Sequence, residues 1–132
     1  MIADATLRAV ARAGTPPWDV SDRAPSTLAD VFGHFRACGR ILVYAGASER
    51  TVFGDPSVNH AFRAWHDWCH IRTGLGFDVP SEVALARWQQ SECSDALARV
   101  VWVEVAEQAI HFERTGQFVV DQVAFAAERG IR

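Results

Sequence analysis

Hydrophobic residues recur along most of this chain at the three- and four-residue spacing of amphipathic helices. Several of these periodic segments follow a serine or aspartate that can cap a helix, and several end at a glycine. The pattern predicts helices over residues 2–13, 27–45, 56–73, 80–92, 95–115 and 117–129. No stretch alternates with a period of two, so no strand is predicted. The expected fold is therefore all-α, a single compact bundle of five to six helices.

The segments between the helices do not indicate a second domain. A chain of 132 residues and 14.6 kDa can build one hydrophobic core and is short for two. Residues 15–25 carry three prolines around Trp18 and are expected to form a loop, and residues 47–54 a turn. Ser26 is the expected cap of the helix that follows the loop. We therefore expect residues 1–132 to form a single helical domain.

Charge and composition exclude several classes of chemistry. Lysine is absent, which rules out the lysine of a Walker A phosphate loop, a Schiff-base lysine and a lysine nucleophile. The net charge of -3 and the pI of about 5.9 give no basic surface for a nucleic acid duplex or an acidic membrane. A small-molecule substrate is the expected partner, and assembly into a homo-oligomer is left open.

The cysteines and the apolar runs indicate the cellular compartment in which we expect the protein. The three cysteines are widely spaced and form no C-x-x-C pair, so neither a disulfide framework nor a cysteine zinc site is expected. No apolar run approaches the roughly 18 residues of a membrane-spanning helix, and the first residues are too polar for a signal peptide. We expect a cytoplasmic protein.

The chemistry gathers in one predicted helix, within residues 59–70, which hold three of the five histidines. His66 and His70 stand one helical turn apart, where two imidazoles can reach one cation. Six polar residues fall within an arc of about 120° on the helical wheel: Asn59, His60, Arg63, His66, Asp67 and His70. Aromatic residues border this arc, which indicates partial burial and a metal site. The competing interpretation is a solvated surface.

A carboxylate in the predicted helix over residues 95–115 points to the same chemistry. Glu104 shares a helical stripe with Leu97, Val101 and Val105, so its side chain should face the core. A buried unpaired carboxylate costs several kcal/mol, and such groups persist where they bind a metal or meet an arginine. Glu104 is therefore a candidate ligand that could meet the histidine arc across the bundle, or a core acid paired with an arginine.

Two arrangements of these residues compete. In the first, His66, His70 and a later acid, Glu104 or Glu82, bind a transition metal such as zinc, and His60 or Asp67 completes the set. The sequence H-D-x-x-H at 66–70 is similar to the H-E-x-x-H motif of zinc peptidases, with aspartate in place of glutamate. This resemblance implies a zinc hydrolase of peptide or amide bonds. Glu82 also has a structural interpretation, because an acid is favourable in the first turn of a helix.

The second arrangement uses the order of the motifs along the chain. An early His34, the His66-Asp67 doublet and a late acid, Asp121 or Glu104, resemble the H...H-D...D pattern of HD-domain phosphohydrolases, which are all-helical metal enzymes. The resemblance implies His34, His66, Asp67 and Asp121 as ligands and a metal-activated water that attacks phosphorus. Arg63 would then orient the phosphate.

The hypothesis favoured from the sequence is a metal-dependent hydrolase of the HD-like type that acts on a phosphate ester or nucleotide. Its cofactor would be a divalent transition metal, Zn, Mn or Fe, and Glu82 or Asp67 would accept the proton. The alternatives are the H-D-x-x-H zinc hydrolase and a non-catalytic helical binding protein with a structural metal or none. Burial separates them: the metal hypotheses need the histidine arc to face a pocket that contains Glu104.

Overall fold

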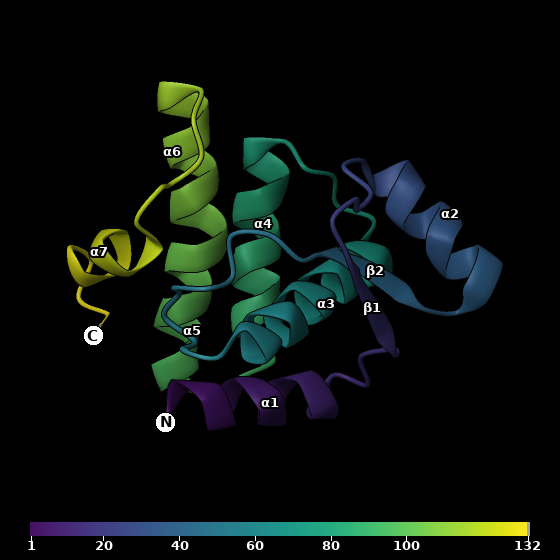
Figure 1. The fold of residues 1–132 in the computed structure, drawn as a ribbon, viewed down its shortest axis with the longest axis horizontal. Coiled ribbons are helices and arrows are strands. Elements are labelled where there is room, and N and C mark those ends of the chain that lie inside the picture. The colour runs from purple at the N-terminus through teal and green to yellow at the C-terminus, as the bar shows by residue number, and fades with distance from the viewer. Residues whose placement is uncertain (132) are drawn as a thin grey trace.

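The computed structural model describes residues 1–131 and is mostly helical (Figure 1). The helical segments are α1 (Ile2–Arg12), α2 (Leu28–Cys38), α3 (Pro56–Thr73), α4 (Val79–Gln90), α5 (Asp95–Val101), the π-helical η1 (Trp102–Glu107), α6 (Gln108–Thr115) and α7 (Gln122–Ala127). Because α5, η1 and α6 follow one another without a break, they form one long helix. Counted this way, the described residues contain six helices, within the five to six that were expected.

A small parallel sheet makes the fold other than strictly all-α. Strand β1 (Trp18–Ser21) pairs with β2 (Ile41–Tyr44), with Trp18 opposite Ile41, and α2 connects the two strands. The prediction of a helix over 27–45 was wrong beyond Cys38, because Gly39 adopts a left-handed conformation (φ 68°) that ends α2. Strand β1 lies in the segment that was predicted to be a loop over 15–25. The prediction missed β1 because its partner, β2, lies in residues that were assigned to a helix.

The central helix α3 has the ends that the sequence predicts. The side chain of Asp55 accepts a hydrogen bond from the Ser57 amide, Pro56 occupies the first turn, and Gly74 (φ 73°) ends the helix. Trp65 is fully buried in the main core. Helix α3 lies in the middle of the molecule, against α1, α4 and the sheet (Figure 1), so residues on different faces of α3 meet different elements.

Some of the other helix ends differ from the prediction by a few residues, and those of the long helix agree with it. Thr27, not Ser26, caps α2 through a bond from the Asp30 amide, and Asp78 caps α4. Ser94 caps the long helix, which ends at Gly116. The last helix was predicted over 117–129 but begins only after Asp121, whose side chain accepts from the Ala124 amide and so caps α7.

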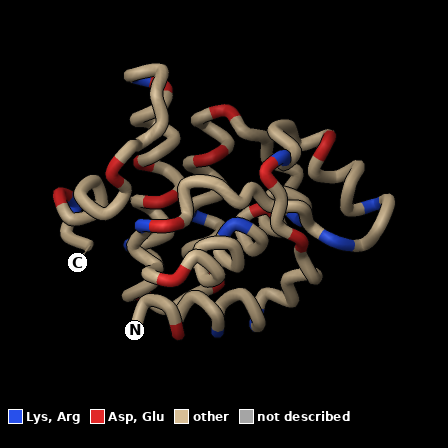
Figure 2. The backbone as a smooth tube through the Cα atoms, in the orientation of Figure 1, with Lys and Arg blue, Asp and Glu red and all other residues tan. Residues whose placement is uncertain are grey.

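Helix α4 and the long helix lie side by side, and α4 contacts both α5 and η1 (Figure 1). No helix among residues 1–131 has the length and apolar character needed to cross a membrane. Arginine and acidic positions are interspersed along the helices and loops rather than gathered at one end (Figure 2).

Candidate metal centre

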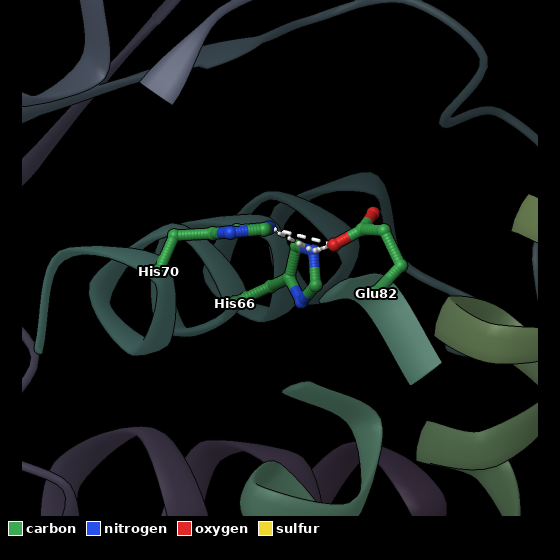
Figure 3. Close-up of side chains that lie close together, drawn as sticks. All are labelled: His66, His70 and Glu82. Atoms are coloured by element: carbon green, nitrogen blue, oxygen red, sulfur yellow. Dashed lines mark hydrogen bonds and ion pairs between the residues drawn. The ribbon is translucent and has the colours of Figure 1, made fainter. Parts of the chain in front are cut away.

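Three side chains from two helices point toward one another beside α3 (Figure 3). His66 and His70 come from α3, and Glu82 comes from the first turn of α4. The His70 Nε2 atom lies 2.8 Å from Glu82 Oε1 and 3.1 Å from His66 Nε2, and His66 Nε2 lies 3.5 Å from Glu82 Oε1. All three ligand atoms fall within 4.8 Å of one another, so this group could hold a metal ion.

The local sequence explains why the three groups meet. A spacing of four residues places both imidazoles on one face of α3. Gly74 then ends α3, and only a short loop separates it from Asp78, the cap of α4. The short loop turns the first turn of α4 back toward the last turns of α3. Glu82 is thereby brought beside His70, whose side chain is fully buried.

Each imidazole is oriented by a hydrogen bond at Nδ1, on the side of the ring away from Glu82. The His70 Nδ1 atom lies 2.7 Å from the Leu75 carbonyl oxygen, and His66 Nδ1 lies 2.9 Å from Gln89 Oε1. A carbonyl oxygen only accepts, so each ring presents an Nδ1–H group to it. Both Nε2 atoms then face Glu82. Metal-binding histidines are held by such bonds.

Electrostatics favour positive charge at this point. Burial alone lowers the pKa of His66, but the Glu82 carboxylate and its hydrogen bond raise it to about 9. Burial alone raises the pKa of Glu82, and the two imidazoles lower it to about 2. Both shifts have the same cause: positive charge between the carboxylate and the rings stabilises the ionised Glu82. A proton shared in an imidazolium–carboxylate pair supplies that charge, and so does a divalent metal ion.

The three groups open onto a cavity of about 550 Å³, a size typical of small-molecule sites. Polar side chains from β2, α3, α4, η1, α6, α7 and the loop before α2 line it, together with a similar number of apolar ones. The polar lining residues are Ser26, Tyr44, Asn59, Arg63, His66, Asp67, His70, Glu82, Glu104, Gln108 and Gln122. Much of the histidine arc of α3 thus faces a cavity that also contains Glu104.

Glu104 lies in the cavity wall but outside the group of three ligands. Its Oε2 atom accepts a hydrogen bond of 2.9 Å from Gln108 Nε2, and its Oε1 atom is buried with no partner among residues 1–131. Burial raises the pKa of Glu104 to about 7, although the charge of Arg63 and the Gln108 bond act in the opposite direction. Of the two acids proposed as the third ligand, the structure brings Glu82 to the histidines.

Asp67 and Arg63 also line the cavity. Burial raises the pKa of Asp67 to about 6, against the pull of the neighbouring imidazoles. Arg63 donates from Nη1 to the carbonyl oxygens of Tyr44 and Gly46, both at 2.6 Å, and so fixes the loop that follows β2. Because these bonds occupy both Nη1 hydrogens, only part of the guanidinium faces the cavity. Burial lowers the pKa of Arg63.

Three other predicted ligands lie elsewhere and are absent from the cavity wall. His60 Nε2 is 3.4 Å from the Ala45 carbonyl oxygen, and His34 Nε2 is 3.3 Å from Cys38 Sγ on α2. Asp121 caps α7 and forms an ion pair with Arg50. The structure therefore does not bring His34 and Asp121 to the His66-Asp67 doublet, and the full H...H-D...D set is not assembled. The arrangement that is assembled is H-D-x-x-H with Glu82.

Gln89 is the site residue that sequence reasoning missed. It is fully buried and holds His66 through Nδ1. A signal for it existed, since Gln89 stands seven residues after Glu82, two helical turns along the same face of α4.

Comparisons with protein-family models, curated proteins and solved structures found no match to this chain. Its function is therefore inferred from its own side chains.

Proposed function

We propose that this protein is a metal-dependent hydrolase whose metal ion is held by His66, His70 and Glu82. One observation carries the proposal: Nδ1 of each imidazole lies against a carbonyl oxygen, and both Nε2 atoms lie within 3.5 Å of the same Glu82 oxygen. Two histidines and a glutamate with an open cavity are the ligand set of many catalytic zinc sites. Zinc is the metal we favour; manganese and iron also accept these ligands.

The side chains around the group support hydrolysis. A divalent cation held there would act as a Lewis acid that polarises a carbonyl or phosphoryl oxygen and makes water a nucleophile near neutral pH. Proton transfer then needs a base whose pKa is close to the working pH. Glu104, with a pKa of about 7, and Asp67, with a pKa of about 6, both line the cavity and meet that requirement.

The cavity favours an amide or ester bond over a phosphate ester. Asp67 and Glu104 add negative charge beside the group of three, and a phosphate would have to approach both carboxylates. Among residues 1–131, Arg63 is the one arginine in the cavity wall, and its Nη1 atom already donates to two backbone carbonyl oxygens. We therefore place the H-D-x-x-H amide or ester hydrolase before the HD-like phosphohydrolase. The phosphohydrolase stays as the second candidate because Arg63 does line the cavity.

The proposal is tested first by metal binding. The untagged protein, stripped with a chelator and titrated with zinc, should bind one ion per chain by elemental analysis after gel filtration. His66→Ala and Glu82→Gln should each weaken binding by at least tenfold, because each removes a ligand atom. His60→Ala is the matched control, since His60 lies on the same helix but outside the group. Equal zinc content in His66→Ala and His60→Ala would refute the centre.

The reaction class is tested next, on the zinc-loaded protein. Hydrolysis of p-nitrophenyl acetate and of small amide substrates should exceed hydrolysis of p-nitrophenyl phosphate, and Glu82→Gln should abolish it. Faster turnover of the phosphate ester would select the HD-like candidate. Stoichiometric zinc without hydrolysis of any of these substrates would favour the non-catalytic protein.

A further inference from the structure

The Glu104 carboxylate has a second feature, in addition to its raised pKa, that the proposed reaction does not use. One oxygen, Oε2, is held by Gln108, which fixes the direction of the carboxylate. The other, Oε1, is buried in the cavity wall and receives no hydrogen bond within residues 1–131. A buried acceptor without a donor costs about 1–3 kcal/mol, and more when it is charged. A donor supplied by a bound molecule would remove that cost.

The charge of the cavity defines which donor fits. Asp67, Glu82 and Glu104 supply three carboxylates to the wall, and Arg63 supplies the one guanidinium that the described residues place there. Arg63 forms no ion pair with Glu104 in the described part of the chain, although its charge acts on that carboxylate. Even with a divalent ion beside Glu82, negative charge remains at Glu104. A cationic donor is therefore favoured over a neutral one, and an anion is disfavoured.

Apolar side chains line another part of the cavity wall. Val105 and Ala109 follow Glu104 along the long helix, and Phe77, Phe112 and Phe118 line the same cavity. The Phe112 and Phe118 rings are stacked, with centroids 4.6 Å apart, and the Phe118 side chain is 80% exposed. Apolar walls of this kind bind a short hydrocarbon or aromatic body, and the faces of aromatic rings also attract cations.

From this combination we propose that the cavity binds a small molecule that carries a protonated amine on an apolar body, with the amine on Glu104 Oε1. This inference names the substrate class of the proposed hydrolase: an amide or ester of an amine-bearing compound, whose scissile bond would reach His66, His70 and Glu82. It rests on the proposed function for the bond that is cleaved, and a Glu104 carboxylate that holds the amine is not the base of that reaction. The binding of the amine itself needs no metal.

Benzylamine, benzyl alcohol and benzoate test the inference, because the three probes share a ring and differ in charge. Titrated by calorimetry into zinc-free and zinc-loaded protein at pH 8, benzylamine should bind at least tenfold tighter than benzyl alcohol. Benzoate should bind weakest to the zinc-free protein. Glu104→Gln should remove the preference for the amine, and Glu104→Asp, which keeps the charge, should retain part of it. Glu113→Gln, an exposed position on the same long helix, is the matched control.

A measurement on the unmutated protein guards against a variant that fails to fold. Benzylamine should shift the Gln108 side-chain amide signal in NMR spectra, since Gln108 is bonded to Glu104, and benzyl alcohol should shift it less. Equal affinity for amine and alcohol, or an unchanged preference in Glu104→Gln, would overturn the inference. Its failure is distinguishable from that of the proposed function: loss of zinc binding with amine binding intact counts against the metal centre alone.

Discussion

At the scale of single residues, the buried acids of the cavity wall set how stability depends on pH. The folded protein raises the pKa of Glu104 from 4.5 to about 7 because burial disfavours its charge. The folded state therefore holds this proton more tightly than the unfolded state does. Between about pH 4.5 and 7, the contribution of Glu104 to the free energy of unfolding falls as the pH rises. Above pH 7 the full cost of the buried charge is present.

We predict that Glu104→Gln raises the free energy of unfolding at pH 8 by roughly 1–3 kcal/mol, the size expected for a pKa displaced this far. At pH 4.5 the variant and the parent should be nearly equal, because the carboxyl is then protonated and neutral in the folded state. Urea unfolding of metal-free protein at the two pH values measures the difference. Glu113→Gln should change neither value. A loss of stability at pH 8 would mean that the carboxylate is paired rather than isolated.

At the scale of elements, helix ends were the most predictable features, because caps are local chemistry. Asp55 and Gly74 bound α3 as expected, and Ser94 and Gly116 bound the long helix. The strands were not predictable in the same way. Each strand has four residues, too few for an alternation with a period of two to be recognised. Strand β2 is stabilised by pairing with β1, from which α2 separates it in the sequence. That pairing is a distant contact that no local pattern reports.

The candidate site also has a part that the sequence predicts and a part that it does not. His66, His70 and Asp67 were predictable from the spacing within one helix. The sequence did not predict that Glu82 rather than Glu104 lies beside the histidines. That choice depends on how the loop after Gly74 orients α4 and on the π-helical segment that carries Glu104. A wheel with 3.6 residues per turn does not describe η1, which displaces the residues that follow it. Distances between helices decided what the pattern left open.

The glycine that ends α3 links this element to the site. Gly74 has a φ of 73°, a conformation that is costly for any residue with a Cβ atom. We predict that Gly74→Ala lowers the free energy of unfolding by about 1 kcal/mol and weakens zinc binding, because the next residue, Leu75, holds His70 through its carbonyl oxygen. Urea unfolding and a zinc titration measure the two effects.

Gly33→Ala is the control for the glycine prediction. Gly33 lies within α2, where a Cβ atom would meet nothing within 4 Å, and its backbone is not left-handed. Alanine is the better helix former, so this variant should gain up to about 1 kcal/mol and leave zinc binding unchanged. Equal effects of the two substitutions would show that the α3 end does not position the site.

At the scale of the whole molecule, the core and the candidate site are separate parts of one structure. The main core gathers buried residues from α1, α3, α4, the long helix and α7, among them Trp65, Leu85 and Leu97. The histidines and Glu82 lie at the wall of the cavity, and of the three only His70 is fully buried. Hydrophobic burial on this scale can hold the fold without a metal ion. A structural zinc site would instead supply much of the folding free energy itself.

This separation predicts how the protein melts. Zinc at a hundred times its dissociation constant should add about 2.7 kcal/mol to the free energy of unfolding, since the ion binds the folded chain. For a domain of this length that is a rise of several degrees in Tm, and Glu82→Gln, which binds zinc at least tenfold more weakly, should show about half of that rise or less. Chelation should return Tm to the lower value and leave the helical circular dichroism at 20 °C unchanged. Loss of helical signal on chelation would make the ion a structural staple, because only a fold that depends on its metal comes apart when the metal is removed.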